Sequence, residues 1–493
     1  MNVKMKLLLT FLLISGICTE ALSQNSQVMY YMNLPQNHFL NPALRPTNKV
    51  YIGLPVISGI NLNINNNILN FKDVFFEGQP ADSIALISEG FDSDRFLSER
   101  GDYNFLREEA SVQVFGLGFS AGKDMYVFMD YNIREEGNFL FPEDLFRLAF
   151  YEEEVLAGNS YDLAGLNIGA QLYNEFGVGF SKNITDRFRI GVKGKLLIGI
   201  ADMKLTTNRF NAEIADDYSQ TWDADMSLDV SGPVTIEWDE EEDMPSEIVF
   251  DESRFESPED IVKNVLSTGN KGFGLDLGAL YNITDKLSVS AAVTDLGFIS
   301  WKEDVTNLQA ESDFVFTGEN LQDVYEGSAN FEDIAEAYID SMMNSVVFSR
   351  TYNQYKTRLS YGITAGGSYK LTKSFSVGLL SHTRYRDNRY HEAFTLSANL
   401  NIRNMFSTSI AYTATNYRRN NIGLGLAFRA GWFQIYAMAD RIPLSWKHVT
   451  DIDGGKIPLP EIWSTAHARL GINLCFGNKE FSGRNDKPMI QIQ

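Results

Sequence analysis

The sequence of 493 residues contains only two cysteines and five histidines, and no long apolar run follows its N-terminal stretch. Cys18 lies in that stretch, so Cys475 is the single thiol of the remaining chain and no internal disulfide framework is expected. No later segment has about 20 uninterrupted apolar residues, so we expect no membrane-spanning helix. The formal charge of −22 argues against nucleic acid as a partner, because phosphates need a basic surface.

Motifs that carry chemistry are also missing. The chain has no Gly-x-Ser-x-Gly, no phosphate-binding glycine loop and no His-Glu-x-x-His; His391-Glu392 is followed by Ala393, which breaks the metalloprotease spacing. The histidines are scattered, so we expect no metal, no cofactor and no catalytic site. Two alternatives stay open: a surface hydrolase in which His382 meets a carboxylate from another strand, and calcium binding by the acidic run 239–243.

The N-terminus has the composition of a secretion signal. Lys4 and Lys6 give it a basic start, Leu7–Ile17 an apolar core, and Ala21-Leu22-Ser23 a small-residue cleavage site before Gln24. We therefore assign residues 1–23 to a signal peptide, which places the protein outside the cytoplasm. The polar end, residues 478–493, is expected to be a tail outside the folded domain.

The segment Phe394–Arg403 shows the pattern that dominates the chain. Its apolar side chains fall at every second position, from Phe394 to Ile402, and the positions between them are polar. A strand points successive side chains to opposite faces, so this strand has one apolar and one polar face. Behind a secretion signal, such strands predict a transmembrane β-barrel with lipid outside and a polar lumen inside. The predicted lipid-facing residues include Leu287, Val289, Leu396, Leu400, Leu424, Leu426, Leu470 and Leu474.

Tight, turn-rich connections alternate with long ones along the chain. Two of the tight connections share the string Asn-Ile-Thr-Asp, at 183–186 and 282–285. Short periplasmic turns and long extracellular loops are typical of outer-membrane barrels, so we predict an all-β, antiparallel up-and-down barrel over residues 50–477. The predicted strands, about 14 with 12 or 16 left open, are 50–60, 110–120, 124–133, 164–182, 187–205, 272–282, 286–297, 358–370, 374–384, 391–402, 405–416, 421–429, 432–442 and 466–476.

Several local features qualify that assignment. The strand phase slips near Phe115, which indicates a bulge, and the segment 164–182 is long enough to contain an extra turn. The connections 206–271 and 298–357 are read as long outer loops of undefined structure. Three tryptophans beyond strand ends are candidates for an aromatic girdle at the membrane boundary: Trp301, Trp446 and Trp463.

A basic group is predicted near the outer mouth of this acidic barrel. It comprises His382, Arg384, Arg386, Arg389, Arg418 and Arg419. Such a patch could bind a carboxylate or a lipopolysaccharide phosphate. The alternative is that these side chains pair with loop acids such as Asp387 and Glu392.

The segment 24–49 carries a resemblance to known families. It contains the step Tyr31-Met32 and, before the first strand, the step Asn41-Pro42-Ala43. This opening resembles that of Bacteroidota outer-membrane proteins of the PorP/SprF type, which are linked to type IX secretion and gliding. The Asn-Pro-Ala step, the long loops and the strand number resemble the FadL-like fatty-acid transporters. That resemblance implies that the segment is a plug inside the lumen; a periplasmic leader is the alternative.

These features favour a non-enzymatic outer-membrane barrel with both mature termini in the periplasm. The first functional hypothesis is passage or capture of small hydrophobic or anionic solutes through a plugged lumen, where glycines such as Gly191, Gly194 and Gly199 would allow a lateral opening. The alternative is a docking subunit that contacts secretion-machinery proteins. Outer-membrane lipid and lipopolysaccharide are expected neighbours in both cases.

Overall fold

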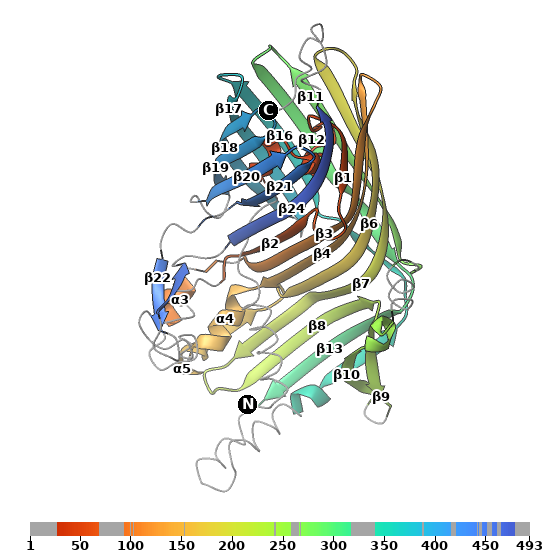
Figure 1. Ribbon diagram of the computed structural model, residues 1–493. Helices are drawn as coiled ribbons and strands as arrows, with labels where there is room; N and C mark the ends of the chain where they lie inside the picture. The colour runs from red at the N-terminus through yellow and green to blue at the C-terminus, as the bar shows by residue number, and fades with distance from the viewer. Residues whose placement is uncertain are drawn as a thin grey trace.

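The computed structural model describes residues 27–68, 93–98, 100–101, 103–151, 153–240, 243–257, 266, 268–316, 341–386, 389–415, 421–440, 442, 446–450, 456–460 and 465–478. No helix within these ranges has the length and apolar character needed to cross a membrane. The described chain is mostly strand, and Figure 1 shows the strands closing into a barrel that continues into a sheet at one end.

The barrel has fourteen strand positions joined in one closed antiparallel ring. In order around the wall they are β1 (Asn48–Gly53) with β2 (Ile60–Asn66), β3 (Asn104–Ala121), β4 (Met125–Phe141), β6 (Asn167–Asn183), β7 (Phe188–Ile214), β11 (Lys271–Asn282), β12 (Leu287–Trp301), β16 (Tyr361–Lys370), β17 (Phe375–Arg386), β18 (Arg389–Ile402), β19 (Phe406–Thr415), β20 (Asn421–Ala430), β21 (Phe433–Ala439) and β24 (Thr465–Asn478). The last strand, β24, pairs with β1 and β2 and closes the ring. The all-β barrel predicted from the sequence is confirmed.

Six short hairpins define one end of the barrel, called here the tight-turn end. In the two Asn-Ile-Thr-Asp turns, the hydroxyl of Thr185 or Thr284 accepts hydrogen bonds from the N–H of the first residue of the next strand and from the N–H of the residue before it. Between β18 and β19, Arg403 and Asn404 both have positive φ, 47° and 54°, and the N–H of Met405 donates to the carbonyl of Ile402 at 2.9 Å, which closes a turn whose twist suits a hairpin. Turn chemistry written in the sequence therefore sets this end.

The outer face of the barrel is apolar, as the alternation predicts. Along β18, every residue from Phe394 to Ile402 at an even position is on the outer face, and Leu396 is 60% exposed. The odd positions, such as Thr395 and Asn399, are buried in the lumen. An apolar outer band with all backbone groups paired around a ring is the arrangement that a β-protein needs in hydrocarbon.

The first strand differs from the prediction. Instead of one strand over 50–60, β1 and β2 are separated by residues 54–59, where Val56 has a φ of 66°. The wall nevertheless stays connected, because the carbonyl of Ile57 accepts a hydrogen bond from the N–H of Ile472 on β24. The structure also bears on two other predictions, the bulge near Phe115 and the extra turn within 164–182. The register of β3 on β4 shifts between Gln113 and Phe115, and β6 is one strand without an extra turn.

The long connections 206–271 and 298–357 are not loops throughout, so that expectation was wrong for their described parts. β7 continues beyond the barrel to Ile214 and pairs there with β8 (Gln220–Ser231), which pairs with β13 (Val305–Phe316) and then β14 (Val346–Thr351). We call the outer part of β7 with β8, β13 and β14 the side sheet. It projects from the long-loop end of the barrel (Figure 1).

The remaining elements surround the side sheet and the long-loop end. They are β5 (Asn159–Asp162), β15 (Tyr355–Arg358), the hairpins β9 (Val234–Asp239) with β10 (Met244–Phe250) and β22 (Trp446–Thr450) with β23 (Lys456–Pro460), the helices α3 (Ser93–Ser98), α4 (Glu143–Phe150) and α5 (Glu153–Leu156), and the 3-10 turns η1 (Gln27–Tyr31), η2 (Pro35–Phe39) and η4 (Glu252–Phe255).

Trp301 is not a girdle residue. It is fully buried where the side sheet branches from the barrel, and its indole N–H donates to the hydroxyl of Thr357 at 2.8 Å. Its ring also lies against Gly199, where a Cβ would come within 2.3 Å of the indole. Trp446 lies on β22, outside the barrel wall, and Trp463 is outside the described residues.

Candidate functional site

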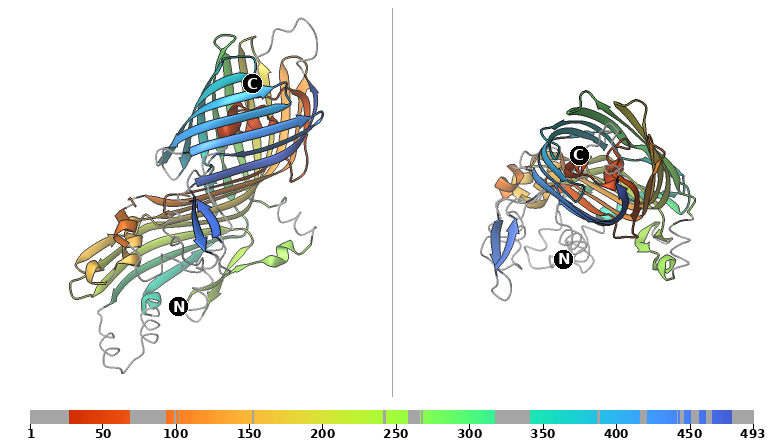
Figure 2. Two further views of the ribbon diagram at one scale, coloured as in Figure 1. Left: turned by 60° about the vertical axis from the view of Figure 1, so that its left-hand side comes forward. Right: turned by 45° about the horizontal axis from the view of Figure 1, so that its top comes forward.

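The lumen of the barrel is occupied by the chain's own N-terminal segment, residues 27–47. None of these residues is exposed, and most are fully buried. The segment carries η1 and η2, and its apolar side chains form one cluster with inward-facing residues of β11, β17, β19, β20 and β21. Figure 2, which looks towards the top of the barrel in its right-hand view, shows this segment inside the ring of strands.

The step Asn41-Pro42-Ala43 docks on two glycines that face each other across β7 and β11. Gly191 and Gly278 are register partners, and both open towards the lumen. A Cβ built on Gly191 would lie 2.1 Å from the carbonyl carbon of Pro42, and one on Gly278 would lie 2.1 Å from Oδ1 of Asn41. No real side chain fits at such distances, so the missing Cβ atoms form a slot for the backbone of the segment. We call this pair the glycine slot.

Asn41 organises the turn that enters the slot. Its Oδ1 accepts the N–H of Ala43 at 2.8 Å, which closes a local turn. Its Nδ2 donates to the hydroxyl of Tyr30 at 3.1 Å and reaches the backbone carbonyl of Ala279 on β11. The asparagine thus connects the turn, the 3-10 segment before it and the barrel wall.

Two tyrosines hold the other half of the segment. Tyr31 lies in the place of a missing side chain at Gly378, and its hydroxyl is 2.7 Å from the carbonyl oxygen of Leu379 and 2.9 Å from that of Gly367. The hydroxyl of Tyr30 is 2.8 Å from Oγ of Ser290 on β12. The step Tyr31-Met32, noted in the sequence, therefore lies against the lumen wall.

Further polar contacts tie the segment to the opposite wall. Gln36 Nε2 donates to Asn473 on β24 at 2.7 Å and to the carbonyl of Ser58, inside the interruption between β1 and β2, at 3.2 Å. Asn33 Nδ2 donates to Asn404 in the hairpin turn at 3.2 Å and to Thr47 at 2.8 Å. The break in the wall and the segment are thus in direct contact.

Beyond the segment, eleven charged side chains form one connected set of ion pairs, called here the lumen ion network. Its members, contributed by β3, β4, β6, β7, β11, β12 and β17, are Glu109, Asp130, Arg134, Glu136, Glu175, Lys193, Lys195, Asp276, Asp295, Arg384 and Arg386. Lys193 is fully buried and its Nζ lies 2.8 Å from both Asp130 and Glu175. A buried lysine of this kind needs such partners, because an unpaired charge is costly to bury.

Part of the network spans the lumen. Arg384 and Arg386 lie on β17, halfway round the ring from β3, yet Arg386 Nη2 is 3.0 Å from Glu109 on β3 and 2.6 Å from Glu136 on β4. Arg384 Nη1 is 3.2 Å from the same Glu109. These contacts are called the cross-lumen bridge. They connect opposite walls of the barrel directly.

A strained residue supports the network from β12. Asp295 has a φ of 62°, which is unusual for a residue inside a strand, and it lies at a register shift opposite Asp276. In this conformation its N–H donates to Oδ1 of Asp276 at 2.7 Å, while its carboxylate receives Arg134 at 2.8 Å and Lys195 at 2.6 Å. The bulge therefore aims both the backbone and the side chain of Asp295 at the network.

The predicted basic patch is only partly assembled. Arg384 and Arg386 lie together, and among the described residues they pair with Glu109 and Glu136 of the far wall. His382 Nδ1 is 2.8 Å from the hydroxyl of Thr364, and its Nε2 has no hydrogen-bond partner among the described residues. Arg389 is exposed and stacks on Tyr103 at 4.1 Å. Arg418 and Arg419 lie outside the described residues, as do Asp387 and part of the acidic run 239–243.

Sequence reasoning missed the acidic half of the network. Glu109 and Glu136 lie in stretches that read as loops, because charged residues interrupt the apolar alternation there. Within the described ranges, no group of three or more histidine, cysteine or carboxylate side chains is placed to hold a metal ion.

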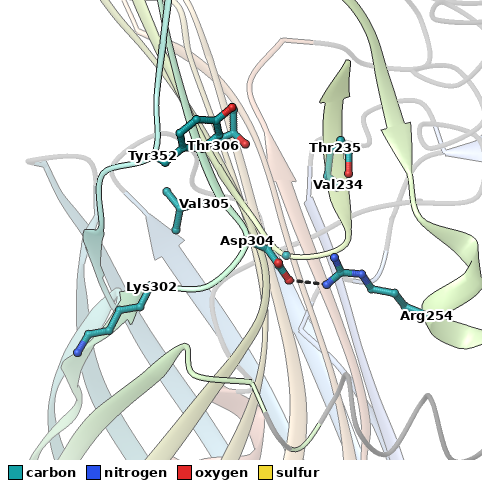
Figure 3. Close-up of a pocket in the computed structure, with 9 residues that line it drawn as sticks. Val234, Thr235, Arg254, Lys302, Asp304, Val305, Thr306 and Tyr352 are labelled. Carbon is teal, nitrogen blue, oxygen red and sulfur yellow. Dashed lines mark hydrogen bonds and ion pairs between the residues drawn. The ribbon is translucent and has the colours of Figure 1, made fainter. Parts of the chain in front are cut away.

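A cavity of about 390 Å³ lies outside the lumen, at the root of the side sheet (Figure 3). Arg254 and Asp304 form an ion pair at its edge, and Lys302, Thr306 and Tyr352 are among its lining residues. The hydrogen bond to Asp304 raises the pKa of the Arg254 guanidinium. The hydroxyl of Ser253 and the guanidinium of Arg254 lower the pKa of Asp251 beside it. These residues hold η4 against the sheet.

A family of unknown function, DUF5723, matches residues 42–440. The chain belongs to the DUF5723 family. The matched range begins at Pro42, in the glycine slot, and ends at Asp440, just after β21. No curated protein matches this DUF5723 protein.

Among solved structures, this DUF5723 protein is similar at low identity to a toluene transporter and a FadL homologue. The toluene transporter TbuX of Ralstonia pickettii is 9% identical, with a TM-score of 0.40 over 91% of this chain and 98% of TbuX. A FadL homologue of Pseudomonas aeruginosa is 10% identical, with a TM-score of 0.41 over 93% of this chain and 100% of the homologue. Because these likenesses are loose, the barrel assignment rests on the strand pairing of the chain itself.

Proposed function

We propose that this DUF5723 protein is a non-enzymatic outer-membrane channel, closed at rest, for small hydrophobic or anionic solutes. The observation that carries the proposal is the N-terminal segment in the glycine slot, together with the cross-lumen bridge beyond it. The segment and the cross-lumen bridge are both held by non-covalent contacts inside a barrel whose inner wall is otherwise polar. Such closures can be displaced without unfolding the wall.

The membrane location follows from the outer face. Its large side chains are apolar around the ring, for example Val178, Leu379, Leu396 and Leu470, whereas the lumen carries the buried polar and charged residues. This two-solvent pattern suits a bilayer, and the tight-turn end would face the periplasm.

The bridge also suggests how an anion could be recognised. Arg384 and Arg386 present guanidinium groups that match a carboxylate or phosphate, and at rest Glu109 and Glu136 occupy them. An incoming anion would compete with these carboxylates and loosen the bridge. His382, two residues from Arg384 on β17, would add a neutral donor or acceptor beside it.

The strand interruption is the proposed place for lateral exit. Residues 54–59 leave the regular sheet, and Ser58 there contacts Gln36 of the segment. Movement of the segment would therefore break its hydrogen bond to Ser58 and change the conformation of residues 54–59. Gly191 and Gly199, which we expected to allow an opening, have other roles here: Gly191 receives Pro42 and Gly199 receives Trp301.

Planar-bilayer conductance tests the proposal. The intact protein should conduct poorly, and a variant without residues 27–45 should conduct several-fold more, provided that it keeps heat-modifiable gel mobility. Equal conductance of the two folded proteins would show that the N-terminal segment does not block the lumen. If the deletion does not fold, Gly191→Ala takes its place. Unchanged uptake of anionic solutes by liposomes carrying Arg384→Ala and Arg386→Ala would remove the anion-recognition part.

A second candidate function is a docking subunit for exported or surface-attached proteins. The side sheet favours it, because a sheet that leaves the barrel and projects beyond it is not needed for a pore. Co-purification of a partner protein with the detergent-extracted barrel, lost when the side sheet is altered, would support this function.

A further inference from the structure

Strand β14 forms an open end of the side sheet. It pairs with β13 from Val346 opposite Ser312 to Thr351 opposite Asn307, without a register shift. Within the part of the chain that the structure describes, no strand pairs along its other edge. The N–H and C=O groups of alternate residues on such an edge form a template on which another strand can add.

The edge has few of the features that usually protect one. Its sequence, Val-Val-Phe-Ser-Arg-Thr, has no proline, no lysine and no bulge, and Val347 is 71% exposed. Its one charge, Arg350, lies 4.7 Å from the ring of Trp238 and 3.8 Å from Glu240, so it is engaged with the β9–β10 hairpin. The strand is therefore open to pairing.

The two faces of the side sheet beside this edge differ in character. On one face, β14 has only the short side chains of Val347, Ser349 and Thr351. Behind them on the same face come the acidic residues of β13 and β8, which are Glu311, Asp313, Asp223, Asp225 and Asp229. The opposite face of β14 carries Val346, Phe348 and Arg350, and the arginine is turned to Trp238 of β9. An added strand would thus meet an acidic surface on one side and an apolar one on the other.

We propose that β14 binds an extended segment of a partner protein in which lysine or arginine alternates with apolar residues. Strand spacing is about 4.8 Å, so a basic side chain on the added strand can cross the short side chains of β14 and reach Glu311 or Asp313. The apolar residues would lie beside Val346 and Phe348. A second copy of this chain is a poor occupant, because it brings the same acidic face and a formal charge of −22. The inference rests on the docking function and names its partner.

The test uses the full-length protein in detergent and labelled eight-residue peptides, read by fluorescence anisotropy. The first peptide alternates lysine and valine, the second alternates glutamate and valine, and the third is the first with a central proline. We expect only the first to bind. Val347→Lys should weaken its binding at least tenfold. Val155→Lys on α5, also an exposed valine at 56%, is the matched control and should leave it unchanged.

Three results would overturn the proposal. The first is equal binding of the proline peptide, which has the same charge but cannot pair along its length. The second is an equal loss of binding in both lysine variants, since that reports net charge alone. The third is self-association of the intact protein that Val347→Lys abolishes, because the occupant would then be a second copy. If no peptide binds but a partner protein still co-purifies with the barrel, β14 is not the binding edge, while the docking function itself is retained.

Discussion

Replacing Gly191 by alanine should loosen the N-terminal segment while leaving the barrel wall intact. The new Cβ would lie 2.1 Å from the carbonyl carbon of Pro42 and 2.2 Å from the N of Ala43, both backbone atoms that cannot rotate away. Ordinary contact begins near 3.4 Å, so the segment must move away from β7, into the lumen, by more than 1 Å, judged from these distances. Overpacking of this kind typically costs about 1–3 kcal/mol. With about 1.4 kcal/mol per factor of ten, the displaced state should be populated about 5- to 150-fold more.

Gly194 provides the control, because it lies three residues further along the same strand and a Cβ there meets nothing within 4 Å. Gly194→Ala shares the general effect of removing a strand glycine, which stabilises by about 0.5–1 kcal/mol at a compatible site. Hydrogen exchange of the amides of Ala43 and Leu44, both bonded to Asn41, reports the segment directly. We expect faster exchange and higher bilayer conductance in Gly191→Ala only. If both variants exchange alike, the segment does not depend on the glycine slot and the reasoning is wrong.

Three further predictions concern separate parts of the lumen and its wall. Arg386→Met removes one of the cations that pair with the buried carboxylates of Glu109 and Glu136 and should destabilise the barrel by about 1.5–3 kcal/mol, seen as a lower temperature of heat-modified gel mobility, whereas Arg358→Met, at an exposed position of β15, should not. Tyr31→Phe removes one hydroxyl and should weaken the segment by about 1 kcal/mol, so its amides exchange roughly fivefold faster while the wall melts as before. Trp301→Ala leaves a cavity where the side sheet leaves the barrel and should lower the free energy of unfolding in urea by about 3–5 kcal/mol. A loss below about 1 kcal/mol would contradict the structural role of Trp301.

The barrel itself could be predicted because its determinants are local. Alternation of apolar and polar residues identifies strands such as 391–402, and the Asn-Ile-Thr-Asp strings identify turns, each within about a dozen residues. The phase slip near Phe115 is equally local, and the structure has a register shift there. Every one of these signals is written in neighbouring residues, so one sequence is enough to read it.

The strand ends and the side sheet could not be predicted in the same way. Residues 104–109 and 134–141 belong to β3 and β4, but Arg107, Glu109, Arg134 and Glu136 interrupt the apolar pattern and gave the appearance of loops. Their charges are compensated by residues up to 277 positions away, such as Arg386, and no local pattern carries that information. The side sheet was missed for another reason: β8 alternates Trp222, Ala224 and Met226 with polar residues, but its acidic face gave the stretch the appearance of a solvated loop.

The candidate site could be predicted in part. Asn41, Pro42 and Gly191 each stood out in the sequence, yet their contact depends on the register that places Gly191 opposite Gly278. Arg384 and Arg386 also stood out together, because they are two apart on one strand. Their acidic partners needed the closed ring, which brings β17 to face β3 and β4.

The segment and the lumen ion network are in direct contact through His38 and Phe39 of η2. His38 of the segment is 3.1 Å from Asp130 through Nε2 and 2.7 Å from the carbonyl of Pro35 through Nδ1. Phe39, the next residue, lies with its ring centroid 4.9 Å from Nζ of Lys193. Withdrawal of the segment would remove both contacts, weaken the hold on Asp130 and Lys193, and so loosen the network from the side that the segment covers.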